Sequence, residues 1–381
     1  MNTADGVDTD TAPTSPHQRR WHPLLRQWSI IATGSAARPW QGATTKAPAT
    51  DTPKHDENCY LCPRVKRSSG QYNPDYTAPW AFDNDFPSLD PKPEPETRHD
   101  VAAASADATS VEVDPAAGDK NYLAASADAR GTCRVLCWHP RHDLTLADID
   151  TDAMQQVVQL WTEEFRRLSA RDDIAQVTIF ENKGVETGVS NLHPHGQIYA
   201  TGFVTATGSQ MRESQAAYSQ ANSGSSLLPE LLGQPEVREL IVDSNEYFIT
   251  LVPFAARFAY ETWIVPRTHT GTLAAMSEPQ LTALALSYQR QARRYDLLFG
   301  RPAPNITLLH NAPVDAHPDN QFCCFHLAMQ PPLREPDKLK FLAGFESAAG
   351  NIINPVLPEL AAERLRQCDP DTHAACQQGT S

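Results

Sequence analysis

The residues best suited to do chemistry lie in a stretch that reads FENKGVETGVSNLHPHGQIYA (180–200). Within this stretch His193, His195 and Gln197 occupy every second position. On one extended strand such side chains share a face, so the two imidazoles would stand about 6.5 to 7 Å apart. Pro194 supplies no ladder donor, which predicts an edge or irregular strand. We interpret this alternation as a functional site rather than as a pair of structural histidines.

A second candidate site is the segment CYLC (59–62), which places two cysteines on one turn. Two thiolates at this spacing form the usual half-site for tetrahedral zinc. The sequence contains no second pair of this kind, so two further ligands must come from elsewhere, and His142 and His193 are the natural candidates. The alternative, a redox pair, lacks the surrounding strand and helix of thioredoxin-like proteins. The adjacent Cys323 and Cys324 are predicted to be packed thiols.

Composition narrows the classes of protein that this chain can belong to. Its 381 residues carry a net charge of −14, which works against non-specific binding to nucleic acid or to an acidic membrane surface. No apolar run approaches the roughly 18 to 20 residues that a membrane-spanning helix needs. The first residues lack the apolar core of a secretory signal, which predicts a cytoplasmic protein. Neither a P-loop nor a dinucleotide-binding glycine motif occurs.

The elements that must position these residues form two similar stretches. Each has an apolar strand that ends in histidine, an amphipathic helix, a second apolar strand, and a last apolar segment that contains histidine. In the first stretch these parts are RVLCWHPRH (134–142), a helix from about Asp150, VTIF (177–180) and HPHGQIYA (193–200). In the second they are YETWIVPRTH (260–269), a helix from Ser277 to near Gly300, ITLL (306–309) and CCFHLAMQ (323–330). Ser277 with Gln280 at the third position predicts a capping box at the start of that helix. The repeated order predicts an internal duplication.

The same reading gives a domain organisation. A catalytic unit is predicted over residues 20–208 and a second unit over residues 209–368. Residues 92–130, rich in Ala, Asp and Pro, read as an exposed insertion in the first unit. Residues 1–19 and 369–381 read as tails.

Several segments together resemble the galactose-1-phosphate uridylyltransferase family of the histidine-triad superfamily. They are CYLCPR, NPDYTAPWAFDNDFPSL (73–89), GTCRVLCWHPRH (131–142), the 180–200 stretch and AAERLR (361–366). The resemblance covers roughly residues 20–90 and 131–367, in the family's order. It implies an α+β fold in which two fused histidine-triad-like units form a mainly antiparallel sheet (a half-barrel) with packed helices. It also implies a homodimer.

The resemblance further implies roles for individual residues. His195 would be the nucleophile that attacks the α-phosphorus of UDP-glucose, and galactose 1-phosphate would then accept the UMP group. Cys59, Cys62, His142 and His193 would bind a structural zinc ion. The substrate-binding residues would be Arg38, Asn84, Asp85, Asn182, Ser190, Gln197, Lys340, Phe341 and Glu346.

Elementary chemistry agrees with these roles. A neutral imidazole is a competent nucleophile at pH 7, because its ordinary pKa is about 6.5. Both leaving groups are sugar phosphates that are stable as anions, so no general acid is required. Hydrolytic members of the superfamily have histidine where Gln197 stands, so glutamine favours transfer over hydrolysis. Two alternatives remain: an enzyme for another nucleotide sugar such as an ADP-hexose, and a non-catalytic binding protein that zinc stabilises.

The sequence also departs from the family. Some members hold a second metal on one Glu and three His. Here only His310 and His326 match, Ala328 replaces the third His, and the Glu position falls near Met211. We therefore expect this second site to be empty or weak.

Three further positions differ near the expected substrate. Ser35 replaces an arginine of the family, Phe345 a tyrosine, and Ile352 stands near an expected glutamine. These changes bear on which sugar is accepted rather than on UMP transfer.

Overall fold

The computed structural model describes residues 17–33, 45, 52–91 and 126–374. Arg38, Ser35 and most of the predicted insertion and tails therefore lie outside the described residues. Residues 17–19 of the predicted first tail belong to a strand, and residues 370–372 of the second form a short 3₁₀ helix.

The strands are β1 (His17–His22), β2 (Gln27–Ala32), β3 (Trp80–Asp83), β4 (Gly131–Cys137), β5 (Gln176–Lys183), β6 (His195–Thr201), β7 (Ile241–Ser244), β8 (Phe248–Leu251), β9 (Thr262–Pro266), β10 (Asn305–His310), β11 (His326–Gln330), β12 (Leu333–Glu335), β13 (Lys338–Leu339) and β14 (Ile353–Asn354). The α-helices are α1 (Thr151–Ser169), α2 (Ala206–Ala221), α3 (Leu227–Leu232), α4 (Pro235–Arg238), α5 (Glu278–Phe299), α6 (Gly344–Ala349) and α7 (Pro358–Gln367).

One nine-stranded sheet organises the described residues, with the order β3-β4-β6-β5-β10-β11-β9-β8-β7. All neighbouring strands in this sheet are antiparallel. The order is symmetric about the central β5–β10 pair, because β4-β6-β5 on one side matches β9-β11-β10 on the other. In chain order, each half runs strand, long helix, strand, strand. The predicted α+β fold of two fused units is confirmed.

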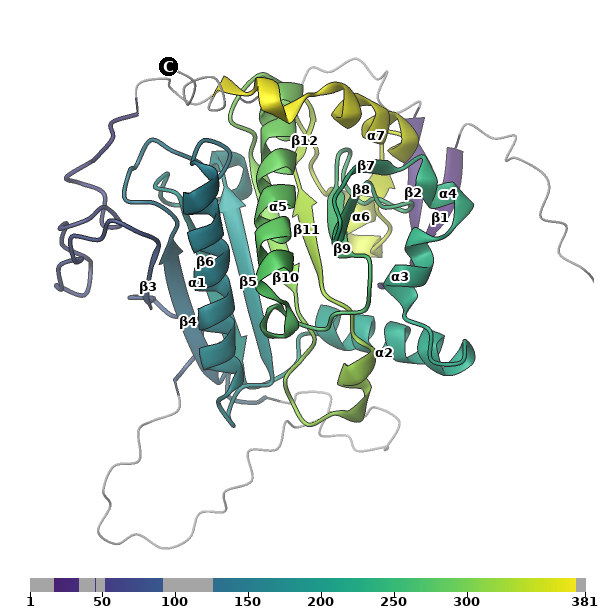
Figure 1. Cartoon of the computed structure of the whole chain (residues 1–381), viewed down its shortest axis with the longest axis horizontal. Helices are drawn as coiled ribbons and strands as arrows, with labels where there is room; N and C mark the ends of the chain where they lie inside the picture. Colours follow the sequence, from purple (N-terminus) through teal and green to yellow (C-terminus); the bar gives the residue numbers. More distant parts are fainter. Residues whose placement is uncertain (1–16, 34–44, 46–51, 92–125, 375–381) are drawn as a thin grey trace, which may run out of the picture.

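The two long helices α1 and α5 cover one face of this sheet (Figure 1). Local sequence fixes their ends. The Asp150 side chain accepts the Ala153 amide at the start of α1, while Ser277 and Gln280 form the predicted capping box of α5. Gly300 ends α5 with a φ of 62°, a conformation that glycine adopts without strain. The apolar faces of both helices pack on the sheet in the largest hydrophobic core.

Among the residues that the structure describes, hydrophobic clusters cover the opposite face of the sheet at its two ends. At one end Leu61 and Tyr76 pack over β3 and β4, and at the other α3 and α4 pack over β8 and β9. Between these covers, β5, β6 and β10 alternate fully buried residues with half-buried ones. Their half-buried residues share one face because side chains alternate along a strand. We call this region the open strip of the sheet.

A separate three-stranded sheet, β1-β2-β14, lies beside the second half of the chain. It brings residues 17–32 against the segment that contains Lys340 and Glu346, since β14 pairs in parallel with β2. Among the described helices, none combines the length and apolar character that a membrane crossing requires.

Candidate functional site

His195 is the first residue of β6, on the open strip. Its Cα pairs with that of Cys137 in β4, and Gln197 pairs with Val135 in β4 and Phe180 in β5. The edge-strand alternative predicted from Pro194 is therefore wrong, because β6 is an interior strand. The irregular alternative holds, since His193 and Pro194 lie just before the strand begins. Pro194 is tolerated because it lies just before the first paired residue, where its carbonyl accepts the Trp138 amide at 2.9 Å.

The face of β6 turned away from the strip rests on a buried tryptophan. Trp138 lies beneath Gly196, where a Cβ atom would come within 2.1 Å of the indole ring. The indole Nε1 donates to Glu181 at 3.1 Å, and the Tyr288 hydroxyl of α5 donates to the same carboxylate at 2.7 Å. Burial raises the pKa of Glu181. These contacts hold β6 against α5 at Gly196, the residue that follows His195.

Replacing Gly196 by alanine should therefore displace the strand that carries His195. The new methyl group would meet a rigid indole, and overpacking of this kind costs about 1–3 kcal/mol or more. We expect a lower melting temperature and a strongly reduced turnover, with partial recovery when Trp138 is also replaced by leucine. Gly233→Ala is the matched control, because its φ is −80° and a Cβ there would make only an ordinary contact, 3.4 Å from the Glu230 carbonyl oxygen. Equal activity of the Gly196→Ala and Gly233→Ala proteins would contradict this account.

The backbone of His193 orients the imidazole of His195. The Nδ1 atom of His195 lies 2.7 Å from the His193 carbonyl oxygen. A carbonyl can only accept, so Nδ1 carries the proton and Nε2 keeps its lone pair. Burial lowers the pKa of His195 below its ordinary value. The ring is therefore neutral at pH 7, with an unprotonated nitrogen directed away from the strand backbone.

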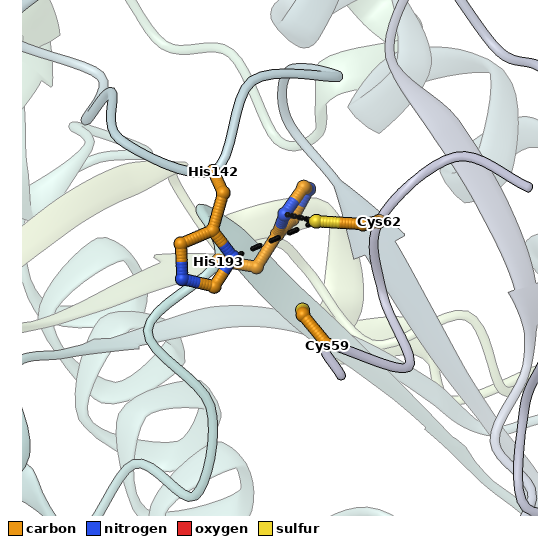
Figure 2. Close-up of side chains that lie close together, drawn as sticks. All are labelled: Cys59, Cys62, His142 and His193. Atoms are coloured by element: carbon orange, nitrogen blue, oxygen red, sulfur yellow. Dashed lines mark hydrogen bonds between the residues drawn. The ribbon is translucent and has the colours of Figure 1, made fainter. Parts of the chain in front are cut away.

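Cys59, Cys62, His142 and His193 form a buried cluster at the end of the open strip. Their ligand atoms all lie within 4.8 Å of one another, and Figure 2 shows the two imidazoles converging on Cys62. The Cys62 Sγ atom lies 3.5 Å from His193 Nδ1 and 3.6 Å from His142 Nδ1. The predicted set of four metal-ligating residues thus comes together from three separate parts of the sequence.

The spacing of this cluster fits a tetrahedral ion. With bonds of about 2.3 Å to sulfur and about 2.05 Å to nitrogen, a tetrahedral zinc places these two ligand types about 3.6 Å apart. Both sulfur–nitrogen distances match that edge. Burial raises the pKa of Cys62 to about 12, so a thiolate there needs a nearby positive charge. The described cysteines are free thiols, as a metal site requires.

The predicted phosphate-binding residues lie near His195. Asn182 and Gln197 are half-buried on the open strip. Gln197 pairs across the sheet with Phe180 of β5, and Asn182 follows Phe180 by two residues on the same strand. Ser190 is exposed in the loop between β5 and β6. Within the described chain, none of these three side chains makes a hydrogen bond to protein. Their amide and hydroxyl groups are therefore available to a ligand.

A buried ion pair holds that loop in place. The Glu186 carboxylate, in the 3₁₀ turn Val185–Thr187, accepts hydrogen bonds from Arg301 and from the Thr45 hydroxyl. The two charged side chains are only 3% and 5% exposed. Burial favours the neutral acid, but these hydrogen bonds outweigh it and lower the pKa of Glu186. The loop that carries Ser190 is thus fastened to the segment between α5 and β10.

The predicted ribose-binding pair follows β3, two strands from β6. The Asn84 side chain accepts the Phe86 amide at 2.9 Å, which forms a local turn. The Asp85 carboxylate lies 3.3 Å from the Arg67 guanidinium, which stacks over Phe82. Phe82 packs with Leu61 and Tyr76, so Asp85 lies on the same side of the sheet as the open strip.

Lys340, Phe341 and Glu346 do not join this group within one chain. Lys340 Nζ donates to Glu346 at 2.5 Å, and Glu346 also accepts the Ile353 amide that leads into β14. Phe341 is 55% exposed and Phe345 is 53% exposed. In the described part of the chain, no hydrogen bond or ion pair connects this segment to Asn182, Ser190, His195 or Gln197.

At the expected second metal position, aromatic stacking replaces a ligand set. The rings of His310 and His326 stack with centroids 4.5 Å apart, and His326 also contacts Trp263. Parallel stacked rings direct their nitrogens side by side rather than toward one centre. Glu213 and Met211 lie on α2. Among the described residues, only the Cys59 cluster brings together three or more side chains able to bind one metal ion, so the expected second ligand set does not converge. A cavity of about 370 Å³, lined by Trp21 and Trp263 among others, lies away from the predicted site residues.

Several residues that shape the site were missed by sequence reasoning. They are Asn73, Tyr76, Trp138, Glu181, Asn191 and Arg67. Asn191 accepts the His193 amide at 2.9 Å and donates to Cys59 Sγ at 3.3 Å. Five of the six lie in motifs that already carried the family resemblance, and Arg67 lies outside them. Membership of those motifs was the available signal.

Comparison with known proteins places these features in a family. Two sequence profiles match the chain: "Galactose-1-phosphate uridyl transferase, N-terminal domain" over residues 8–205, and the corresponding C-terminal domain over residues 211–378. The galactose-1-phosphate uridylyltransferase of Haemophilus influenzae is 35% identical over 356 residues, covering 93% of this chain and 95% of the relative. That of Rattus norvegicus is 33% identical, covering 95% of this chain and 90% of the relative.

Solved structures share the fold at lower identity. A uridylyltransferase structure superposes with a TM-score of 0.68 at 23% identity and covers 95% of this chain and 99% of its own. An ADP-glucose phosphorylase of Arabidopsis thaliana with bound ADP-glucose gives a TM-score of 0.69 at 20% identity, covering 92% of this chain and 98% of its own. At these identities the similarity extends to the fold alone.

Proposed function

Because the chain belongs to the galactose-1-phosphate uridylyltransferase family, we propose that it transfers the UMP group of UDP-glucose to galactose 1-phosphate through a covalent bond to His195. The observation that carries this proposal is the state of that imidazole. It is neutral, its Nδ1 proton is held by the His193 carbonyl, and its free Nε2 lies on the open strip. Nucleophilic catalysis by histidine requires this state.

The reaction proceeds in two balanced steps. First, Nε2 of His195 attacks the α-phosphorus of UDP-glucose, a phosphorus–nitrogen bond forms, and glucose 1-phosphate leaves with the electron pair of the broken bond. Second, a phosphate oxygen of galactose 1-phosphate attacks the same phosphorus. The phosphorus–nitrogen bond breaks and UDP-galactose leaves, which restores the neutral imidazole. Gln197 and Asn182 donate amide hydrogens to the nonbridging oxygens, where negative charge accumulates.

The cluster at Cys59 and Cys62 holds zinc in this proposal. When bound, zinc supplies a structural tie between the cysteine loop and the strand of His195. With four protein ligands the tetrahedron is complete, so no position is left for substrate. The ligand thiols must stay reduced, which supports a reducing compartment such as the cytoplasm.

The proposed active enzyme is a homodimer in which each site uses both chains. Lys340, Phe341 and Glu346 are expected at the hexose, yet within one chain they are not joined to His195. Phe341 and Phe345 are exposed aromatic side chains, which favours an interface with another protein surface at this segment. A two-fold dimer would let this segment reach the open strip of its partner, and Arg38 would reach the phosphates in the same way.

Subunit complementation tests this arrangement. His195→Gln and Lys340→Ala proteins should each have little activity alone. Co-refolded mixtures should recover about a quarter of the wild-type rate per chain, because half of the dimers are mixed and each has one intact site. Mixing either variant with itself is the control. Absence of any recovery in confirmed mixed dimers would place both residues in the same chain.

The substrate test is product analysis with UDP-glucose plus galactose 1-phosphate, repeated with ADP-glucose and with N-acetylgalactosamine 1-phosphate. We expect UDP-galactose and glucose 1-phosphate in equal amounts. Turnover of ADP-glucose without turnover of UDP-glucose would defeat the proposal and favour the ADP-hexose alternative.

A further inference from the structure

The segment Asn73–Tyr76 braces the cysteine loop of the metal cluster. Asn73 Nδ2 donates to the carbonyl oxygens of Tyr60 at 2.9 Å and Cys62 at 2.8 Å. The Tyr76 hydroxyl donates to the carbonyl between them, that of Leu61, at 2.7 Å. Three consecutive carbonyls of the loop are thus held by one short segment, and Asn73 is only 3% exposed.

The hydrogen bonds of Tyr76 determine which nitrogen of His193 carries a proton. The hydroxyl has one hydrogen, and the Leu61 carbonyl can only accept it. The Tyr76 oxygen must therefore act as the acceptor toward His193 Nε2, which lies 2.9 Å away. It follows that Nε2 of His193 carries the hydrogen and Nδ1 is left with its lone pair.

That lone pair faces the cluster. His193 Nδ1 lies 3.5 Å from Cys62 Sγ, at the spacing of two ligands on one tetrahedral ion. The carbonyl of the same residue accepts the Nδ1 proton of His195. His193 therefore connects the metal cluster and the proposed nucleophile, and its own ring is held from behind by Tyr76.

We propose that Tyr76 is a positioning residue that fixes the tautomer and direction of His193, so that Nδ1 binds the metal and the His193 backbone aims His195. The inference rests on the zinc part of the proposed function. Without the hydroxyl, Nε2–H of His193 loses its partner in a fully buried position, where His193 is 1% exposed. The ring can then adopt the other tautomer, which removes the metal-binding lone pair.

The competing explanation is packing alone. The Tyr76 ring stacks on Trp80 with centroids 5.3 Å apart. Phenylalanine keeps this stacking and removes only the hydroxyl, so Tyr76→Phe separates the two explanations. Tyr295→Phe is the matched control. Tyr295 is also buried, at 1% exposed against 8% for Tyr76, and donates to the Tyr260 carbonyl at 2.7 Å, but it lies on α5 in the second unit, away from the cysteine loop.

The experiment compares zinc release from the full-length wild-type, Tyr76→Phe and Tyr295→Phe proteins, by competition with a chromogenic chelator. We expect zinc affinity to fall by about 10- to 100-fold in Tyr76→Phe only. The pattern of imidazole ¹⁵N shifts in the zinc-loaded wild type should show hydrogen on Nε2 of His193, and this readout needs no variant. Unchanged zinc release in a folded Tyr76→Phe protein, hydrogen on Nδ1, or a wild-type protein that binds no zinc would each overturn the proposal.

These readouts do not depend on turnover. If wild-type protein binds zinc but never transfers UMP, the proposed function fails and the role of Tyr76 is still decided by zinc release. If transfer occurs and zinc release is unaffected by the loss of the hydroxyl, only the role of Tyr76 fails.

Discussion

Replacement of His195 by glutamine is expected to reduce UMP transfer by at least about 10⁴-fold, as for the loss of other covalent nucleophiles. Glutamine is of similar size and can still donate to the His193 carbonyl, so the strand should keep its position. It cannot form the phosphorus–nitrogen bond, because its amide nitrogen has no available lone pair. Initial rates of UDP-galactose formation, with the melting temperature as a check on folding, give the measurement.

His269→Gln is the control for this experiment. His269 lies three residues beyond the end of β9 in the second unit, is exposed, and its Nδ1 atom lies 2.9 Å from the Ser226 hydroxyl. We expect it to retain wild-type activity. A His195→Gln protein that retains more than about one hundredth of the wild-type rate would contradict the nucleophile assignment.

Among these substitutions, loss of one zinc ligand should have the second-largest effect on the protein, lowering its zinc affinity, stability and transfer rate. Cys62 is fully buried and is the thiol closest to both imidazoles. Its replacement by serine removes a soft ligand and leaves a buried hydroxyl among three unsatisfied partners. We expect zinc affinity to fall by more than about 100-fold. Loss of a hydrogen bond that only supports a ligand already lowers metal affinity by up to about 100-fold, and loss of the ligand itself should cost more. Folding is coupled to metal binding in such sites, so the melting temperature should fall as well.

The transfer rate should fall together with the zinc content, because the His193 backbone orients His195. Metal analysis of the purified protein, thermal unfolding and activity measure the three effects. Cys324→Ser provides the control, since Cys324 is equally buried but packs against the far end of the sheet. Full zinc content and activity in Cys62→Ser would show that the four residues are not a metal site.

Local patterns in the sequence predicted the main elements well. The apolar spacing after Asp150 and the capping box at Ser277 identified α1 and α5 with nearly correct ends, because the information for a helix and its caps is local. The duplication followed from the order of similar stretches. The sheet order then places the two copies on either side of the β5–β10 pair. Amphipathic periodicity and repetition were thus sufficient for the two duplicated units, whereas the α+β class with a mainly antiparallel sheet was implied by the family resemblance.

Long-range contacts explain what the sequence could not show. Pro194 suggested an edge or irregular strand, but β6 is an interior strand that pairs with β4 from His195 onward and with β5 from Gln197 onward. The supports of the site, Trp138 beneath Gly196 and Tyr76 behind His193, come from positions 58 and 117 residues away. Nothing in either local pattern predicts these contacts, because they depend on how the strands are registered.

The most direct test of the account uses UDP-glucose without any acceptor. The wild-type protein should gain the mass of one UMP group per chain and release an equal amount of glucose 1-phosphate. Proteolysis should then place the modification on the peptide that contains His195, as an acid-labile, base-stable adduct. Adding galactose 1-phosphate should remove it and yield UDP-galactose. Transfer to galactose 1-phosphate without any such adduct, or an adduct on a different residue, would contradict the central claim.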